Sequence, residues 1–301
     1  MTTSAVAAAR EHEIRAPDGR RLHAYEAGDP GGALVVAHHG TPCSGVLARW
    51  WAEDAAARGI RLVGYDRPGY GGSDRHAGRS IADVATDVVA IADHFGAARF
   101  RTWGVSGGGP HALACAALLP DRVVAAATLA SVAPYRAAGV DWLAGMGQDN
   151  VDEFGAAEAG EGALRPFLAD ASAGLLGAGP AGLAEEMRSI LGAPDVAVLS
   201  GEVASFMYAW LSTGQRHGFD GWLDDDLAFV GDWGFDPGSI RVPLLVLQGR
   251  HDLMVPFAHG EWLAENIPAA SARLTEADGH LTLITDVGPV HAWLLDIGTG
   301  G

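Results

Sequence analysis

Lysine is absent from this chain, and all 20 basic residues are arginine. A chain without lysine cannot form a Schiff base, supply a P-loop lysine or build a Ser-Lys dyad. Cysteine is scarce as well: Cys43 and Cys115 have no metal-type spacing, so we expect two buried, reduced thiols. No set of histidines and carboxylates has the spacing of metal ligands, so we expect neither a metal nor another cofactor.

Positive charge is scarce too, and the formal net charge is −17 at pH 7. Phosphate binding needs clustered basic side chains, so this charge argues against a nucleic-acid partner. The longest apolar run, over residues 112–134, is broken by Asp121 and Arg122, so no membrane span is expected. The N-terminus lacks the basic region of a secretory signal. We therefore expect a cytoplasmic monomer or homodimer that acts on a small molecule.

What the chain does have is material for a large core: 301 residues, of which 49% are apolar and 19% charged. An opening hairpin is predicted over residues 12–27, around a turn at Pro17 to Arg20. The continuous apolar run at 33–37 is typical of a strand buried on both faces, residues 60–65 are a second strand candidate, and residues 123–129 are interpreted as another buried strand. Helical patterns at 46–57 and 80–95 separate them. This alternation predicts an α/β fold with a mostly parallel, doubly wound sheet.

The alternation stops between about residues 135 and 236, where no strand pattern is visible and four of the nine tryptophans lie. A shorter helix is predicted over residues 223–230, and strands and helices resume at about 242. We therefore predict a core of residues 1–134 and 237–301 with a helical insertion at 135–236. One helical stripe in the insertion is formed by Val196, Leu199, Val203, Phe206 and Trp210.

The stretch from Gly104 to Gly108 reads Gly-Val-Ser-Gly-Gly and falls between a strand pattern and an alanine-rich helical pattern. A serine on such a sharp turn needs glycine on both sides, because side chains there would collide with the neighbouring strand and helix. The start of the helix would favour negative charge that develops beside Ser106. Ser106 is therefore a candidate nucleophile.

A serine nucleophile needs a base, and the base needs an orienting acid. Asp252 and His280 each follow a predicted strand, so each lies on a loop at a strand end. Asp278 could replace Asp252 as the partner of the imidazole, and Glu276 could be a solvated neighbour. The position after the strand favours Asp252. The order Ser106, Asp252, His280 is the order of the triad in α/β-hydrolases.

With these motifs the chain resembles the α/β-hydrolase fold family, in the branch shared by proline iminopeptidases, cofactor-free haloperoxidases, epoxide hydrolases and small-molecule esterases. The resemblance covers nearly the whole chain and implies an eight-stranded type of sheet with a helical cap at 135–236. The matching segments, in the family's order, are His39-Gly-Thr-Pro42, Asp66-Arg-Pro-Gly-Tyr-Gly-Gly-Ser73, Gly104-Val-Ser-Gly-Gly108, Gly249-Arg-His-Asp252 and Gly279-His280.

Carried over residue by residue, the resemblance implies that Ser106 is the nucleophile, His280 the general base and Asp252 the residue that orients it. The oxyanion hole would be formed by the backbone N–H groups of Thr41 and Gly107. The epoxide-hydrolase branch has an aspartate where Ser106 stands, so attack on an acyl carbon is expected instead.

The cap is expected to set specificity, with Trp142, Phe206, Trp210 and Trp222 as candidates for the pocket wall. The run Asp224 to Asp226 is interpreted as a solvated helix start. A cap carboxylate such as Glu202 could bind a substrate amine, although the sequence singles none out. Histidines near the motifs are expected to pack or support rather than bind metal: His38, His39, His111 and His251.

The sequence therefore predicts a carboxylesterase-like serine hydrolase acting on a small or medium-sized hydrophobic molecule through an acyl-serine intermediate. A proline iminopeptidase-like aminopeptidase and a perhydrolase or haloperoxidase are alternatives within the family. A small-molecule receptor on the same fold is the alternative without catalysis.

Overall fold

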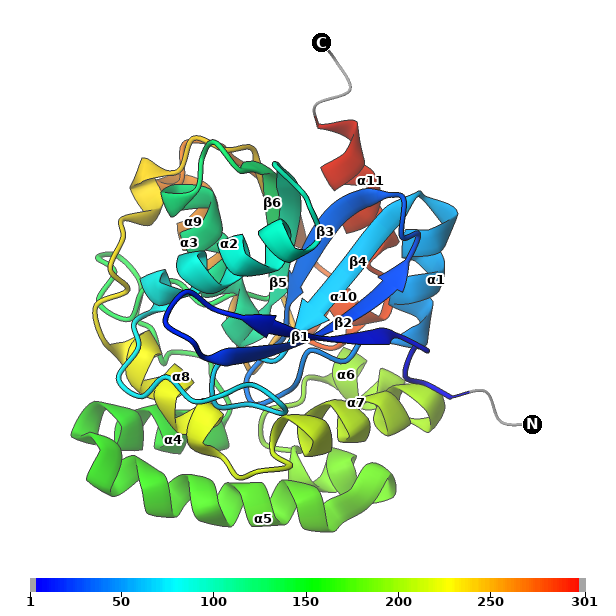
Figure 1. Ribbon diagram of the computed structural model, residues 1–301. Helices are drawn as coiled ribbons and strands as arrows, with labels where there is room; N and C mark the ends of the chain where they lie inside the picture. Colours follow the sequence, from blue (N-terminus) through cyan, green and yellow to red (C-terminus); the bar gives the residue numbers. More distant parts are fainter. Residues whose placement is uncertain (1–3, 298–301) are drawn as a thin grey trace.

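The computed structural model describes residues 4–297, so the first three and last four residues of the chain lie outside it. Its centre is an eight-stranded sheet in the order β1-β2-β4-β3-β5-β6-β7-β8 (Figure 1). The first two strands form the predicted hairpin, β2 also runs antiparallel to β4, and the other neighbours are parallel. The strands are β1 (Arg10–Arg15), β2 (Arg21–Gly28), β3 (Ala33–His38), β4 (Ile60–Tyr65), β5 (Phe100–Val105), β6 (Val123–Leu129), β7 (Leu244–Gly249) and β8 (Ala270–Thr275).

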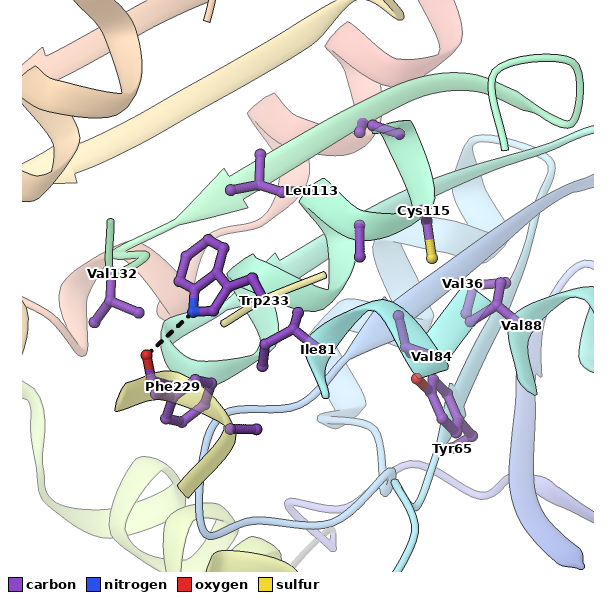
Figure 2. Packing of buried hydrophobic residues seen from close by; sticks show 14 of the residues in the cluster. Val36, Tyr65, Ile81, Val84, Val88, Leu113, Cys115, Val132, Phe229 and Trp233 are labelled. Carbon is purple, nitrogen blue, oxygen red and sulfur yellow. Dashed lines mark hydrogen bonds between the residues drawn. The ribbon is translucent and has the colours of Figure 1, made fainter. Parts of the chain in front are cut away.

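The sheet is covered on both faces because alternate side chains of its central strands enter two separate cores. In β3, Val36 belongs to one apolar cluster, and its neighbour Val35 belongs to the other. Figure 2 shows part of the first cluster, in which Val36 of β3 is joined by the helix residues Val88 and Leu113. The predicted α/β class with a mostly parallel sheet is confirmed. The helices that cover these faces are α1 (Arg49–Ala57), α2 (Val84–His94), α3 (Gly109–Leu118), α9 (Phe257–Asn266), α10 (Thr282–Thr285) and α11 (Gly288–Asp296).

Three short 3-10 turns among the described residues carry turn or capping signals in the sequence; two of them precede helices and one precedes a strand. Ser80 and Asp83 form a capping box at the turn η1 (Ile81–Asp83) before α2. The turn η2 (Ser106–Gly108) leads into α3, and η3 (Pro237–Ser239) precedes β7.

The segment predicted as an insertion is helical, and most of its helices gather on one side of the sheet (Figure 1). The single helix predicted through Val196 and Trp210 is wrong. The chain breaks at Ser200, which is extended, and Gly201, which has a φ of 53°. The division into core and cap stays a prediction. The helices here are α4 (Gln148–Ala159), α5 (Glu161–Glu186), α6 (Ala193–Val198), α7 (Gly201–Gly214) and α8 (Asp220–Val230).

Candidate active site

Ser106 lies on a strained turn between β5 and α3. Its φ is 53°, a left-handed conformation that costs a non-glycine residue of the order of 1–3 kcal/mol. The flanking glycines make the turn possible, because a Cβ on Gly104 would collide with the Gly108 carbonyl, and one on Gly108 would collide with the His38 carbonyl of β3. The strain is concentrated at the residue whose side chain the sequence predicts to be reactive.

The structure brings Asp252 and His280 together, although 28 positions separate them. Asp252 follows β7 and His280 follows β8, and these strands are parallel neighbours. The His280 Nδ1 atom lies 2.8 Å from Asp252 Oδ2. Burial lowers the pKa of His280, but the charge of Asp252 and its hydrogen bond outweigh burial, so the net shift is upward. The imidazole therefore has a partner that stabilises its protonated form.

Within residues 4–297, neither rival carboxylate is hydrogen-bonded to the His280 ring, whose Nδ1 atom is bonded to Asp252. The backbone carbonyl of Asp278 accepts a hydrogen bond of 2.9 Å from the His251 N–H. Glu276 forms an exposed ion pair with Arg250, 2.8 Å between Oε1 and Nη2.

Two residues that the sequence did not single out hold this pair in place. Gln248 Nε2 donates to Asp252 Oδ2 at 3.1 Å, and the backbone N–H groups of Met254 and Val255 donate to Oδ1. Asp195, at the start of α6, accepts hydrogen bonds from the backbone N–H groups of His280 and the two residues after it. The loop that carries His280 is thus attached to the helical insertion through a buried carboxylate.

Thr41 and Gly107, the predicted oxyanion-hole residues, are direct neighbours. A Cβ on Gly107 would collide with Thr41 Oγ1. Gly107 is the second residue of the turn η2, directly after Ser106, and the Thr41 hydroxyl donates to Asp225 Oδ2 at 2.6 Å. The Thr41 side chain therefore lies against the Gly107 backbone, and both residues line the same cavity as Ser106. That their two backbone N–H groups form an oxyanion hole stays a prediction.

A cavity of about 510 Å³ lies between this region and the helical insertion. Ser106, Gly107, Thr41 and His280 all line it. No hydrogen bond joins Ser106 to the His280 ring within residues 4–297. Such bonds often tighten only when substrate is bound.

The predicted aromatic wall is only partly formed by the four residues named from the sequence. Trp210 and Trp222 line the cavity, whereas Trp142 and Phe206 are not among its lining residues. Trp142 packs against Phe154 with ring centroids 4.5 Å apart, and Phe206 stacks on Trp210. Periodicity identified these aromatics as buried but could not distinguish helix–helix packing from a cavity wall.

The interpretation of Asp224 to Asp226 as a solvated helix start is wrong, because all three side chains are buried in α8. Asp225 is fully buried between two arginines: its Oδ2 lies 2.6 Å from Arg67 Nη2 and its Oδ1 lies 2.7 Å from Arg79 Nη2. Burial would raise the pKa of Asp225, but these two charges hold it well below its usual value. The ion pairs connect α8 to the loops after β4, beside Thr41.

Replacing Asp225 by asparagine should destabilise the fold, because two buried guanidinium groups would lose their counter-charge. Breaking a buried ion pair costs about 3–5 kcal/mol, so the urea midpoint should fall sharply. Since the folded-state pKa is depressed, this stabilisation is present above the unfolded pKa and is lost as the pH falls toward the folded pKa. Asp224→Asn is the matched control, because its partner Arg75 is partly exposed and can be solvated. Equal midpoints for the two variants would contradict this account.

The third residue of the run, Asp226, faces the cavity together with Glu153 of α4. Both Asp226 carboxylate oxygens are buried, and apart from the Glu153 carboxyl group they have no hydrogen-bond partner among the described residues. Burial and the charge of Glu153 raise the pKa of Asp226 well above its usual value, and burial also raises the pKa of Glu153. These two residues are called the carboxyl pair below.

Asp226→Asn should stabilise the protein increasingly as the pH rises. The pKa of Asp226 is higher in the folded state than in the unfolded state. This carboxyl group therefore contributes to the free energy of unfolding below its unfolded-state pKa, and the contribution is lost as the pH rises through its folded-state pKa. The asparagine amide can donate to Glu153 at every pH and so removes this loss. Melting temperatures across a pH series measure the effect, with the exposed Glu202→Gln as control. A difference from wild type that does not change with pH would show that the pair is not coupled.

Sequence signals for the missed residues are uneven. Asp226 lies four residues after Trp222 and three before Phe229, a helical spacing that places all three on one face, and all three line the cavity. Asp195 had no comparable signal, because its hydrogen bonds reach residues more than 80 positions away.

A serine on a strained strand-to-helix turn, with a His–Asp pair at later strand ends of a mostly parallel sheet, defines the α/β-hydrolase class. A sequence model of the alpha/beta hydrolase fold matches residues 33–156. Epoxide hydrolase A of Mycobacterium tuberculosis is 28% identical, over 94% of this chain and 95% of that protein.

Solved structures share the fold as well. A hydrolase from Pseudomonas aeruginosa PA01 aligns with a TM-score of 0.68 at 20% identity, over 98% of this chain and 100% of that one. A thermophilic esterase from Thermogutta terrifontis aligns with a TM-score of 0.67 at 20% identity, over 96% and 100% of the two chains. The chain has the α/β-hydrolase fold and is similar in sequence to hydrolases of that fold, so the predicted fold is confirmed, and the prediction of a hydrolase is confirmed at that level. In residues 4–297 no helix is both long and apolar enough to cross a bilayer.

Proposed function

We propose that this protein is a serine hydrolase that cleaves a carboxylic ester, or a closely related acyl bond, of a small or medium-sized hydrophobic molecule. The observation that carries the proposal is that Ser106, on its strained turn, and His280, bound to Asp252, open on one cavity. The size of the cavity supports a small-molecule substrate, because ligand pockets typically span about 300–1,000 Å³.

In the proposed reaction, Ser106 Oγ attacks the acyl carbon while His280 Nε2 takes its proton. The carbonyl oxygen becomes an oxyanion that accepts hydrogen bonds from the N–H groups of Thr41 and Gly107. The C–O bond to the leaving alcohol then breaks, and His280 returns the proton to that oxygen. Water, deprotonated by His280, attacks the acyl-serine, and the acid leaves with Ser106 restored. Asp252 keeps the Nδ1 proton in place throughout.

A serine at position 106 supports acyl transfer rather than epoxide opening, despite the name of the Mycobacterium relative. Epoxide opening in the branch that the chain resembles uses an aspartate there, and a serine cannot replace the carboxylate that forms the ester intermediate. The lining of Trp210, Trp222, Phe229 and other apolar residues supports a hydrophobic acyl or alcohol group.

A substrate panel tests the proposal. Aryl esters of short and medium chain length are compared with aminoacyl arylamides, with styrene oxide, and with bromination in acetate and peroxide. We expect ester hydrolysis to have the highest kcat/KM, with Ser106→Ala as the blank for each reaction. Faster turnover of the arylamides would identify an aminopeptidase, and turnover of the epoxide alone would contradict acyl transfer.

A further inference from the structure

The carboxyl pair, Glu153 and Asp226, is a buried group that the proposed acyl transfer does not use. It is contributed by two packed helices, α4 and α8, and it lines the same cavity as Ser106. Glu153 Oε1 accepts a hydrogen bond of 2.7 Å from Trp222 Nε1. Asp226 is fully buried, and apart from the Glu153 carboxyl group its oxygens have no donor among the described residues. A buried carboxylate that faces a cavity and has only another carboxyl group as a hydrogen-bond partner is available to a ligand.

The surroundings of the pair are mostly negative. Burial, Glu153 and then Asp225 raise the pKa of Asp226, and Arg79 opposes them. The Arg79 guanidinium, however, lies 2.7 Å from Asp225 Oδ1 and so has its own counter-charge. Burial and Asp149 raise the pKa of Glu153, while the hydrogen bond from Trp222 lowers it. Two ionised carboxylates cannot hydrogen-bond to each other, so without a ligand the pair is satisfied only by sharing a proton.

The other acidic side chains that line the cavity add further negative charge to its wall. Among the described residues that line it, none is arginine and the chain has no lysine. Asp149, Asp170 and Glu186 are exposed to solvent, so the negative charge in the low-dielectric part of the cavity is that of the carboxyl pair. That charge disfavours an anionic ligand and favours a cation. The acidic residues of the lining are Asp149, Glu153, Asp170, Glu186 and Asp226.

We propose that the carboxyl pair is a subsite for a protonated amine, so that the preferred ligands of this cavity are hydrophobic molecules that carry an ammonium group. The ammonium N–H groups donate to the oxygens of Asp226 and Glu153, and the shared proton leaves to solvent as the ligand binds. That the amine belongs to a substrate rests on the proposed function; the binding itself does not. Affinity should therefore rise with pH wherever the amine stays protonated.

Three probes of matched size test the subsite by calorimetry: benzylamine, benzyl alcohol and benzoate. We expect benzylamine to bind about tenfold or more tightly than benzyl alcohol, as hydrogen bonds to charged groups imply, and benzoate to bind least. The benzylamine affinity should increase over about pH 6 to 8, where an alkylamine remains protonated.

Variants assign the preference to the pair. Asp226→Asn and Glu153→Gln should each remove most of the difference between amine and alcohol while binding of the alcohol persists, which shows that the cavity is intact. Glu202→Gln removes a cap carboxylate outside the cavity lining, where Glu202 pairs with Arg49 at 2.7 Å, and should keep the preference. Phenyl esters of alanine and isobutyrate, which are nearly isosteric, test the same preference in kcat/KM.

Equal binding of benzylamine and benzyl alcohol, no binding of benzylamine, or a preference unchanged in both pair variants would overturn the proposal. In each case the pair would be a proton-sharing contact between α4 and α8 only. Turnover of the isobutyrate ester with no amine preference would leave the serine hydrolase standing without the subsite. Binding of benzylamine with no turnover of either ester would leave the subsite standing without the hydrolase.

Discussion

Ser106→Ala is expected to abolish ester hydrolysis while leaving the fold intact. Loss of a serine nucleophile in a triad costs on the order of 10⁶-fold in kcat, and the remaining rate reflects binding and the oxyanion donors alone. Alanine keeps the Cβ, so the strain at a φ of 53° is unchanged and the melting temperature should stay close to that of the wild type.

The measurement is kcat with the aryl ester that the substrate panel ranks first. Ser131→Ala is a suitable control: Ser131 is buried near the end of β6, its hydroxyl bonds to the Val132 carbonyl, and it does not line the cavity. This control should retain activity. If Ser106→Ala kept a comparable kcat, hydrolysis would not proceed through Ser106.

Asp252→Asn is expected to lower kcat by about 10⁴-fold, the loss that follows when an imidazole is held in the wrong tautomer. Asp252 accepts the bond from His280 Nδ1, and an asparagine amide at that place can donate instead. Asp278→Asn is the matched control. Asp278 is only two residues from His280 in sequence, but within residues 4–297 its carboxylate is not hydrogen-bonded to the His280 ring. The control should retain wild-type activity. Equal losses in the two variants would mean that Asp252 is not the partner that matters.

The pH profile provides a second readout for this contact. In the wild type the pKa of His280 is raised, because its contacts with Asp252 oppose the effect of burial. The acidic limb of the kcat/KM profile should therefore lie at a higher pH than the pKa of an ordinary histidine. In Asp252→Asn, only the charge of Asp195 still opposes the effect of burial on the pKa of His280, so the acidic limb should move to lower pH. An unchanged limb would show that another group controls it.

Local patterns were sufficient to predict several strands of the sheet and the turn that carries Ser106. The strands at β4 and β6 were predicted with the bounds the structure gives, because continuous apolar runs between turn signals are local features. The turn at Ser106 was predictable for the same reason, since its two glycines are dictated by contacts within the same segment and with β3.

Long-range contacts explain what the sequence did not reveal. Three consecutive aspartates are typical of an exposed helix face, and only the fold brings Arg67 and Arg79 to Asp225 and Glu153 to Asp226. Asp195 orients the His280 loop through backbone N–H groups, which leave no side-chain pattern in the sequence. The position of the cavity between Ser106 and the helices of the insertion depends on packing that periodicity alone does not specify.

Labelling with a fluorophosphonate, followed by mass spectrometry of the peptides, tests the central claim most directly. The account predicts one adduct on Ser106, absent in Ser106→Ala and strongly slowed in His280→Ala, because the base must take the proton during attack. No adduct on the folded protein, or an adduct on a residue other than Ser106, would contradict it.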